Sequence, residues 1–461
     1  MSTSQNTIVA LSTPQGTSGI AVIRLSGEDA FAIIDKVFVG KIISEQPSHT
    51  LHFGKIVDDE KLLDEVVISI FKNPHSYNGE DTVEISCHGS MFIIQKIISL
   101  LVQSGARIAS PGEFTKRAFM NGKLDLSQAE AVADIIASEN ESQHKMAIQQ
   151  MRGGYSEKIS GLRQELIDFA ALIELELDFS EEDIEFADRK KFYELVDQTL
   201  DILDHLIDSF QLGNVIKKGI PIAIVGKPNV GKSTLLNRLL NEEKAIVSEI
   251  AGTTRDFIED TLQLKGMTYR FVDTAGIRET TDILESKGIE RSYEKIKQAE
   301  IIFYLADITE PLDKIVDDYN SIEFAPDQKV IILLNKSDEL DNFCNAYDIE
   351  EAIATLTRKT TLEISAKQNR NLDKLISILE DTVGTKHQSF DFIVSNARHL
   401  QAFQDAKNSL EQVKQGLNNR ISGEFISIDI RAALHALGTV TGEISNEDVL
   451  SSVFSRFCIG K

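Results

Sequence analysis

The sequence predicts a multidomain protein of the α/β plus α class. An α+β domain is followed by a helical domain that is split by an inserted α/β domain. The first observation is length, because 461 residues are too many for one hydrophobic core and suggest about three domains. The second is the order of patterns: mixed elements in 1–122, helical periodicity in 123–217 and 385–461, and alternating strands and helices in 218–384. Since insertions are tolerated where the termini of the inserted domain lie close together, we expect one interrupted helical domain.

The composition is that of a globular protein with a strong acidic balance. Apolar residues make up 42% of the chain, and 48 basic against 72 acidic residues give a net charge of −24. Nucleic-acid binders are usually basic at least locally, so any RNA contact would be a local patch or belong to a partner. The scattered Cys87, Cys344 and Cys458 form neither a disulfide framework nor a zinc site. We see no signal peptide and no apolar run that could span a bilayer, and therefore expect a cytoplasmic protein without a membrane partner.

The first 122 residues mix short strands and helices. We expect strands over 20–25, 66–71 and 83–87 and a helix over 92–102, with Gly, Pro and Ser at the breaks. This mixture predicts a compact α+β domain.

Apolar residues recur at helical spacing on both sides of the inserted domain. Leu162, Leu166 and Ile173 share one face of an amphipathic helix, and the same periodicity returns in 400–410. Asn446 has the side chain of an N-cap for the last helix.

The inserted segment alternates strand-like and helical runs, which predicts a parallel sheet with helices on both faces. The expected strands, in chain order, are 220–225, 269–272, 301–306, 330–334 and 361–364.

A phosphate-binding loop follows the first of these strands. Residues 226–233 read Gly-Lys-Pro-Asn-Val-Gly-Lys-Ser, the P-loop pattern, and a helical run follows at 235–240. Backbone N–H groups close around phosphate oxygens there, at a helix N-terminus. Lys232 neutralises the outer phosphates and Ser233 ligates Mg²⁺. The other expected contacts in the loop are Asn229, Val230, Gly231 and Thr234.

Three further motifs stand at strand ends, in the order of a Ras-like GTPase domain. They are Asp-Thr-Ala-Gly at 273–276, Asn-Lys-Ser-Asp at 335–338 and Ser-Ala-Lys at 365–367. The carboxylate of Asp338 can accept two hydrogen bonds from guanine, whereas adenine offers no such donor pair, so the site selects GTP. We expect Thr254 to complete the Mg²⁺ shell. The remaining expected GTP contacts are Asp273, Thr274, Ala275, Gly276, Asn335, Lys336, Ser365, Ala366 and Lys367.

The catalytic group differs from that of small signalling GTPases. Their water-orienting glutamine is replaced here by Ile277. Glu285 is the best candidate to orient water, the alternative being a solvated charge of the switch region. The amide oxygen of Asn229 could bind a monovalent cation beside the phosphates. Arg278 could instead supply an arginine finger, or be an ordinary surface arginine.

Long runs outside these motifs are more specific. They read Thr-Ile-Val-Ala at 7–10, Ser-Pro-Gly-Glu-Phe-Thr-Lys-Arg-Ala at 110–118, Asn-Gly-Lys-Leu-Asp-Leu-Ser-Gln-Ala-Glu-Ala at 121–131 and Phe-Cys-Ile-Gly-Lys at 457–461. With them, the chain resembles the MnmE family of tRNA-modification GTPases, also called TrmE, over essentially its whole length. The resemblance implies an N-terminal domain that dimerises and binds a 5-formyl- or 5,10-methylene-type tetrahydrofolate through Arg24, Glu84, Lys123 and Lys461.

The resemblance also implies how the GTPase works and with whom. Hydrolysis would be stimulated by potassium, with G domains pairing across the dimer and Glu285 orienting water. Ser248 and Thr253 would also contact the nucleotide, and the potassium ligands would be Asn229, Ser248, Ile250 and Thr253. The family acts with the flavoprotein MnmG, which holds FAD, in a heterotetrameric complex that adds an aminomethyl-type group to carbon 5 of the wobble uridine of certain tRNAs.

Two questions stay open on the sequence. Cys458 is either a reactive thiol beside the one-carbon folate or a small buried residue that anchors the tail. The chain could also be a GTPase switch in ribosome assembly, or a scaffold that binds GTP without hydrolysing it.

Overall fold

The structure is a computed structural model. It describes residues 7–59, 61–178, 188–242, 261–264, 266–272, 297, 299–326, 328–340, 346–384, 392–419, 421–455, 457 and 459–460. The chain divides into two compact units, each described below by itself. One comprises Met1–Ala137, Ala147–Leu203 and Gln401–Lys461, and the other comprises Ser138–Met146 and Asp204–Leu400.

A seven-stranded mixed sheet forms the N-terminal part of the first unit, in the order β3-β4-β5-β6-β2-β1-β7. The strands are β1 Ile8–Leu11, β2 Ser18–Ser26, β3 Phe38–Val39, β4 Thr50–Asp58, β5 Lys61–Phe71, β6 Thr82–Gly89 and β7 Arg107–Ile108. Neighbouring strands run antiparallel except β1 and β7, which are parallel. The three strands expected from the sequence are present, within longer elements.

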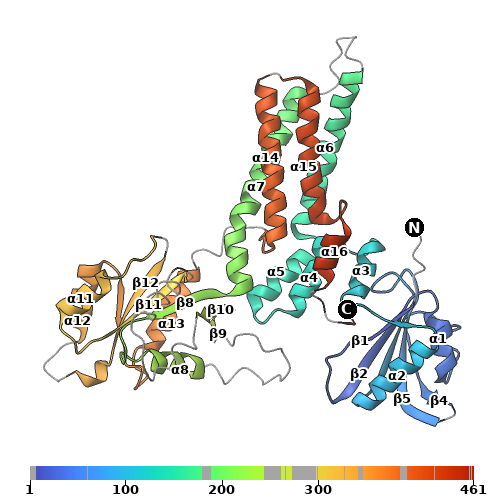
Figure 1. The fold of residues 1–461 in the computed structure, drawn as a ribbon, viewed down its shortest axis with the longest axis horizontal. Helices are drawn as coiled ribbons and strands as arrows, with labels where there is room; N and C mark the ends of the chain where they lie inside the picture. The colour runs from blue at the N-terminus through green and yellow to red at the C-terminus, as the bar shows by residue number, and fades with distance from the viewer. Residues whose placement is uncertain are drawn as a thin grey trace. The chain divides into compact units, whose positions relative to one another are not determined.

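Helices α1 (Ala30–Val37) and α2 (Met91–Gln103) pack on one face of this sheet (Figure 1). Ile23 and Leu25 of β2 and Ile85 of β6 lie in the core beneath them and are fully buried. Because side chains alternate along a strand, the residues between them belong to the opposite face. Arg24 and Glu84 therefore lie on the face of the sheet opposite α1 and α2.

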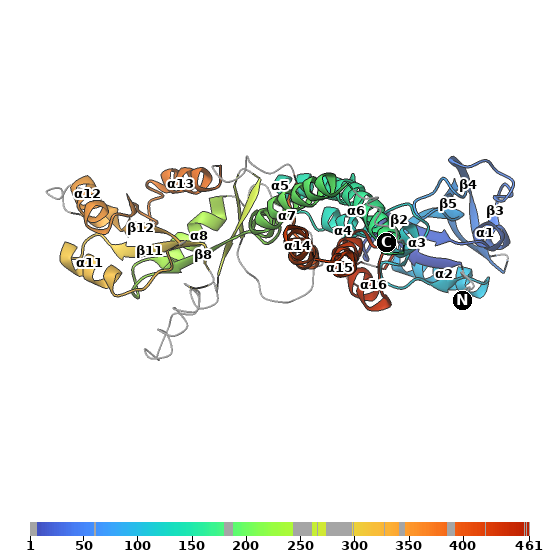
Figure 2. The ribbon, with the colours of Figure 1, turned by 90° about the horizontal axis from the view of Figure 1, so that it is seen from above.

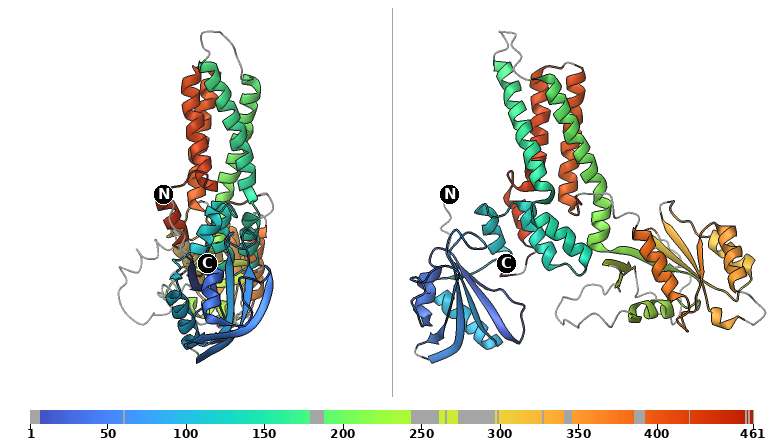
Figure 3. Two further views of the ribbon diagram at one scale, coloured as in Figure 1. Left: turned by 90° about the vertical axis from the view of Figure 1, so that its right-hand side faces the viewer. Right: turned by 180° about the vertical axis from the view of Figure 1, so that it is seen from behind.

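The rest of the first unit is helical. Its helices, some of which continue into the second unit, are α3 Glu113–Met120, α4 Leu126–Ile136, α5 Glu141–Met151, α6 Gly154–Asp178, α7 Arg189–Lys218, α14 Ala397–Asn418, α15 Gly423–Thr441 and α16 Glu447–Phe454. Helices α6, α14 and α15 run side by side, end-on in Figure 2 and lengthwise in Figure 3. The segments before and after the inserted domain therefore share one bundle.

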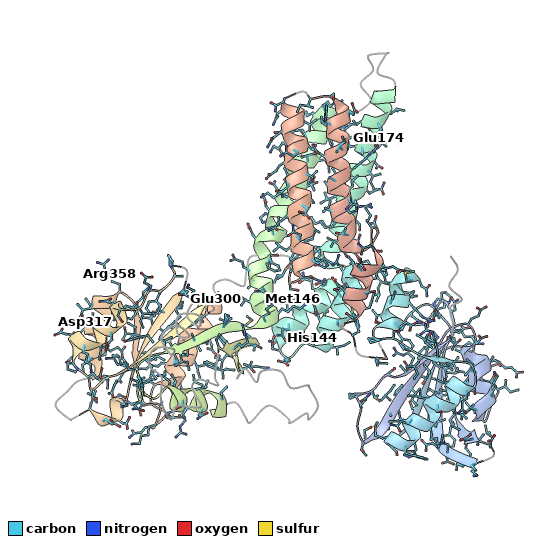
Figure 4. The ribbon with its side chains drawn as sticks, viewed as in Figure 1. His144, Met146, Glu174, Glu300, Asp317 and Arg358 are labelled. Carbon is cyan, nitrogen blue, oxygen red and sulfur yellow. The ribbon has the colours of Figure 1, made fainter. Side chains whose placement is uncertain are left out.

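Local signals and packing agree in this bundle. Asn446 caps α16 as expected, since its side chain accepts a hydrogen bond of 2.8 Å from the Val449 amide. Leu166 and Ile173 of α6 are fully buried, as their spacing predicted. On the bundle surface Arg431 of α15 donates to Glu174 of α6, which is labelled in Figure 4, at 3.0 Å. No helix in the described ranges is long and apolar enough to cross a membrane.

The second unit contains a six-stranded sheet in the order β13-β12-β11-β8-β10-β9. Its strands are β8 Ile220–Val225, β9 Thr261–Leu264, β10 Met267–Phe271, β11 Ile301–Asp307, β12 Lys329–Asn335 and β13 Thr360–Glu363. Five of them are parallel, as expected, but β9 runs antiparallel to β10. The expectation of a purely parallel sheet was therefore wrong at this edge. Four residues give too little alternation to identify β9 from the sequence.

Helices cover both faces of this sheet. They are α8 Lys232–Glu242, α11 Leu312–Asn320, α12 Ala346–Thr357 and α13 Leu372–Gly384, with a short 3₁₀ turn, η2, at Ser337–Glu339. Leu235 and Leu375 join α8 and α13 to one hydrophobic cluster, and Ile315 and Ile353 join α11 and α12 to the other. Met146 of α5, which is labelled in Figure 4, belongs to the first cluster.

Candidate functional site

The P-loop connects the end of β8 to the start of α8, in the strand–loop–helix context that the motif requires. Two glycines shape it. Gly226 has φ +153° and Gly231 has φ +100°. A Cβ on Gly226 would lie 2.2 Å from the Leu305 carbonyl oxygen, and one on Gly231 would lie 2.3 Å from the Asn335 amide nitrogen. Only glycine fits both positions, and the result is a loop of closely spaced backbone amides that suits phosphate oxygens.

Lys232 is the first residue of α8, and its ammonium folds over this loop. Its Nζ donates to the carbonyl oxygens of Gly226 and Lys227, each at 2.7 Å. A triphosphate would offer anionic oxygens in place of these neutral acceptors, and an ammonium is attracted more strongly to an anionic oxygen than to a neutral carbonyl oxygen. Ser233 and Thr234 follow in the first turn of α8, where a hydroxyl oxygen suits Mg²⁺.

Asn335, at the end of β12, joins the phosphate side of the site to the base side. Its amide nitrogen donates to the Val230 carbonyl oxygen at 2.8 Å, and its amide oxygen accepts from the Ala366 amide at 2.9 Å. The residue is only 3% exposed, so both bonds are shielded from water. The loops 226–231, 335–338 and 365–367 are therefore held together at one edge of the sheet.

Asp338 lies in η2, with its carboxylate oriented by a neighbouring motif. Its Oδ1 accepts a hydrogen bond of 2.6 Å from the Ser365 hydroxyl. The second oxygen and the remaining lone pairs are the acceptors that it can present to a guanine ring. Lys367 follows Ala366 in the same loop and is exposed.

Lys336 is fixed beside them. It has φ +66°, and its Nζ donates to Oδ2 of Asp307 at 2.6 Å. Burial alone would raise the pKa of Asp307, but hydrogen bonds from Lys336 and Thr309 outweigh it and lower the pKa. The hydrogen bond that Lys336 donates to Asp307 in turn raises the pKa of Lys336. The pair is charged at neutral pH and fixes the base-recognition loop to the end of β11.

A second cluster of predicted site residues lies on the N-terminal sheet. Arg24 of β2 and Glu84 of β6 are direct cross-strand partners. Nε and one terminal nitrogen of Arg24 lie 2.9 and 2.8 Å from Oε1 of Glu84. Lys123 donates from Nζ to the Pro74 carbonyl oxygen at 3.0 Å. A cation, a carboxylate and a second cation are thus available in one domain for a ligand that has both donors and anionic groups.

The C-terminal tail returns to this domain. The Ser12 hydroxyl donates to the Gly460 carbonyl oxygen at 3.2 Å, and a Cβ on Gly460 would lie 2.1 Å from the Leu11 carbonyl oxygen. Ala10, the neighbour of Leu11 in β1, is the cross-strand partner of Arg24. The last described residue of the chain therefore packs on the strand next to the Arg24–Glu84 pair.

Comparison with known proteins identifies the family of the chain. The family model described as the MnmE helical domain matches residues 126–458, and that described as the GTP-binding protein TrmE N-terminus matches residues 7–123. Three relatives are each called "tRNA modification GTPase MnmE". The protein of Flavobacterium johnsoniae is 52% identical, with 99% of both chains covered. Those of Christiangramia forsetii (99% of both) and Cytophaga hutchinsonii (99% of this chain, 98% of that one) are 51% and 49% identical. The chain belongs to the MnmE family.

Several of the residues predicted for an MnmE-type site lie outside the described residues. In the switch regions these are Ser248, Ile250, Thr253, Thr254, Asp273, Thr274, Ala275, Gly276, Ile277, Arg278 and Glu285. In the C-terminal tail they are Cys458 and Lys461. Their roles stay predictions.

The structure adds site residues that the sequence reasoning missed. Asp307 pairs with Lys336, and Asp318 of α11 pairs with Lys227 of the P-loop. The end of a buried parallel strand, which located the other motifs, could have indicated Asp307. No sequence signal indicates Asp318, because the pair joins segments far apart in the chain.

A buried ionic network lies beside the cluster on the MnmE N-terminal domain. Glu113 of α3 pairs with Arg107 and, at 3.0 Å, with Arg117, which also binds Glu80 at 3.0 Å. Burial would raise the pKa of Glu113, but hydrogen bonds from Arg107, the Ser110 amide and Arg117 hold it at about 2. The group therefore stays ionised well below its ordinary pKa.

This network predicts a defined pH dependence. A carboxyl whose pKa falls from 4.5 unfolded to about 2 folded stabilises the fold above pH 4.5 and loses that contribution as the pH falls toward 2. Its side chain is 12% exposed, and the shift corresponds to about 3 kcal/mol. We expect the loss of unfolding free energy caused by Glu113→Gln to be larger at pH 7 than near pH 2 by about this amount. Urea unfolding of the full chain between pH 7 and 2.5 measures this difference. Glu28→Gln, at an exposed position, is the control. An equal loss at both ends would contradict the assignment.

Proposed function

We propose that this chain is a potassium-stimulated GTPase that carries out 5-(carboxymethyl)aminomethyl-type modification of the wobble uridine of certain tRNAs. It would act in the cytoplasm as a homodimer, in a heterotetrameric complex with the flavoprotein MnmG, and use a one-carbon tetrahydrofolate. FAD would be held by the partner alone. The observation that carries the proposal is the meeting of the P-loop, the 335–338 loop and the 365–367 loop at one sheet edge, joined by Asn335.

Selectivity for GTP follows from the groups at the two ends of this edge. The amides of the P-loop and Lys232 match a triphosphate. The carboxylate of Asp338, oriented by Ser365, matches the paired donors of guanine. Adenine offers no pair of hydrogen-bond donors that would match a fixed carboxylate at this place. Membership of the MnmE family gives the same assignment independently.

Hydrolysis needs cations and an oriented water. Ser233, with Thr254, would hold Mg²⁺, which neutralises charge on the phosphates. Asn229, Ser248, Ile250 and Thr253 would hold K⁺, and Glu285 would orient the water. The exposed Asn229 has φ +63°, so its backbone turns within the loop next to Val230 and Gly231. An amide oxygen there is a suitable ligand for a hard monovalent cation.

Potassium dependence tests this part of the proposal and separates it from a GTP-binding scaffold. We expect GTP turnover to be at least roughly tenfold faster in KCl than in NaCl of equal ionic strength, about 1.4 kcal/mol of transition-state stabilisation. Asn229→Gly should remove most of this difference. Glycine accepts a positive φ without strain, so the variant deletes the amide and keeps the loop. Equal and negligible rates in both salts would favour the scaffold. A potassium effect that Asn229→Gly leaves intact would assign the cation elsewhere.

The one-carbon folate would bind at the Arg24–Glu84 pair. The cations Arg24 and Lys123 suit the glutamate tail or the ring carbonyl of the folate. The carboxylate of Glu84 suits the pterin N–H groups. The packing of Gly460 on Leu11 supports a role for the tail residues Cys458 and Lys461 at the same place. The net charge of −24 supports a complex in which the partner supplies much of the grip on tRNA.

A further inference from the structure

We propose that Tyr77 is a positioning residue of the folate site, whose aromatic ring holds the Arg24 guanidinium in the orientation that a ligand meets. The inference rests on the proposed folate function and adds a residue to it. Tyr77 lies in the segment between β5 and β6, outside every motif that the sequence offered. Three structural observations support the assignment.

The first observation is the environment of the Arg24 guanidinium. Its central carbon lies 5.6 Å from the ring centroid of Tyr77 and 5.5 Å from that of Phe114. Both distances are within the range of an attractive cation–π contact. Two aromatic faces and the carboxylate of Glu84 therefore surround one planar cation. The ion pair alone fixes one edge of the guanidinium, and the rings fix its plane.

The second observation is that Tyr77 is itself held in place. Its hydroxyl shares a hydrogen bond of 2.9 Å with the hydroxyl of Thr115, which is fully buried in α3. The carbonyl oxygen of the next residue, Asn78, accepts a hydrogen bond of 2.7 Å from the side-chain amide of Asn121. Burial raises the pKa of Tyr77, although the Thr115 hydrogen bond and the charge of Arg24 oppose it. The phenol is thus neutral at physiological pH and presents a fixed ring face.

The third observation is the difference between the two rings. Phe114 is fully buried, whereas Tyr77 is 40% exposed. Phe114 therefore belongs to the core beneath the guanidinium, and Tyr77 is the ring that borders the surface from which a ligand arrives. Both contacts from Arg24 to Glu84 end on Oε1 of the carboxylate. The other terminal nitrogen of Arg24 and Oε2 of Glu84 are the groups through which the pair can meet a pterin or a carboxylate tail.

Two substitutions separate the ring from the hydroxyl. Tyr77→Leu removes the ring but keeps an apolar side chain, and Tyr77→Phe keeps the ring and removes only the bond to Thr115. Isothermal titration of the full-length chain with 5-formyltetrahydrofolate measures the affinity. Phe92→Leu is the matched control, because Phe92 is an exposed aromatic residue of the same domain on α2, which covers the opposite face of the sheet.

We expect Tyr77→Leu to weaken binding by roughly threefold to thirtyfold, the range of a cation–π contact that is partly shielded from water. Tyr77→Phe should stay within about twofold of the unmodified chain, because the ring face is retained. Phe92→Leu should change neither the affinity nor the thermal unfolding midpoint. Rescue by phenylalanine is the result that a general loss of loop structure would not produce.

The contrary outcomes are distinct. If the unmodified chain binds and Tyr77→Leu binds equally well, the positioning role is wrong and the folate site stands. If Tyr77→Phe loses as much affinity as Tyr77→Leu, the hydroxyl and not the ring carries the effect, which also overturns the role. If the unmodified chain does not bind 5-formyltetrahydrofolate at all, both the proposed folate site and the proposed role of Tyr77 are wrong.

Discussion

Lys232→Ala is expected to slow GTP hydrolysis by roughly a hundredfold to a thousandfold, as the loss of a preorganised charge at a transition state does. The reason is the position of the ammonium, which lies over the P-loop and within 2.7 Å of two of its carbonyl oxygens. Among the described residues, no other lysine stands at the first position of the helix that follows this loop. Phosphate release in single-turnover conditions, with protein in excess over GTP, measures the chemical step.

The matched control for this variant is Lys227→Ala in the same loop. The ammonium of Lys227 pairs with Asp318 of α11 instead of folding over the loop. Its removal changes the charge of the loop by the same amount, and we expect turnover to stay within roughly tenfold. Equal losses in the two variants would show that the net charge of the loop, and not the location of Lys232, supports hydrolysis.

Asp338→Asn is expected to change which nucleotide the protein prefers. In the proposed site the carboxylate would accept hydrogen bonds from two guanine donors, and each hydrogen bond to a charged group contributes about 1.5–3 kcal/mol. An asparagine presents one oxygen and one amide donor, so one of the guanine donors would meet another donor. We expect GTP affinity to fall at least roughly a hundredfold. Xanthosine triphosphate, which carries a carbonyl where guanine has its amine, should bind more tightly than GTP.

Equilibrium binding of fluorescent GTP and xanthosine triphosphate analogues measures this preference. Glu339→Gln is the matched control, since Glu339 lies in the same η2 turn, is exposed and loses the same charge. It should leave the ratio of the two affinities unchanged. If Asp338→Asn weakens both nucleotides equally, the residue supports the loop through its bond to Ser365 and does not recognise the base.

How much of the fold the sequence predicts depends on element length. The buried strands β8, β11 and β12 were correctly predicted, because each is a run of mostly apolar residues, and a motif stands at the end of both β8 and β12. Strands β1, β3, β7 and β9 were missed, because two to four residues do not establish a period, and β4 was missed as well although it has nine residues. Their identity depends on pairing with neighbours, which is a property of the folded sheet.

The residues of the candidate site also differ in how far the sequence predicts them. Lys232, Ser233 and Asp338 were predicted from motifs in which spacing and chemistry coincide. Asp307 and Tyr77 were not, because a single polar or aromatic residue without a motif is ordinary in a sequence. Their significance comes from contacts made across the fold, such as the rings of Tyr77 and Phe114 at Arg24.

The nucleosides of tRNA from a strain that lacks this chain test the central claim most directly. We expect the aminomethyl-type group at carbon 5 of the wobble uridine to be absent from the affected tRNAs. Expression of the unmodified chain should restore it. Expression of Lys232→Ala should not, because we propose that the modification requires GTP hydrolysis by this chain. An unchanged wobble uridine in the strain that lacks the chain would contradict the account.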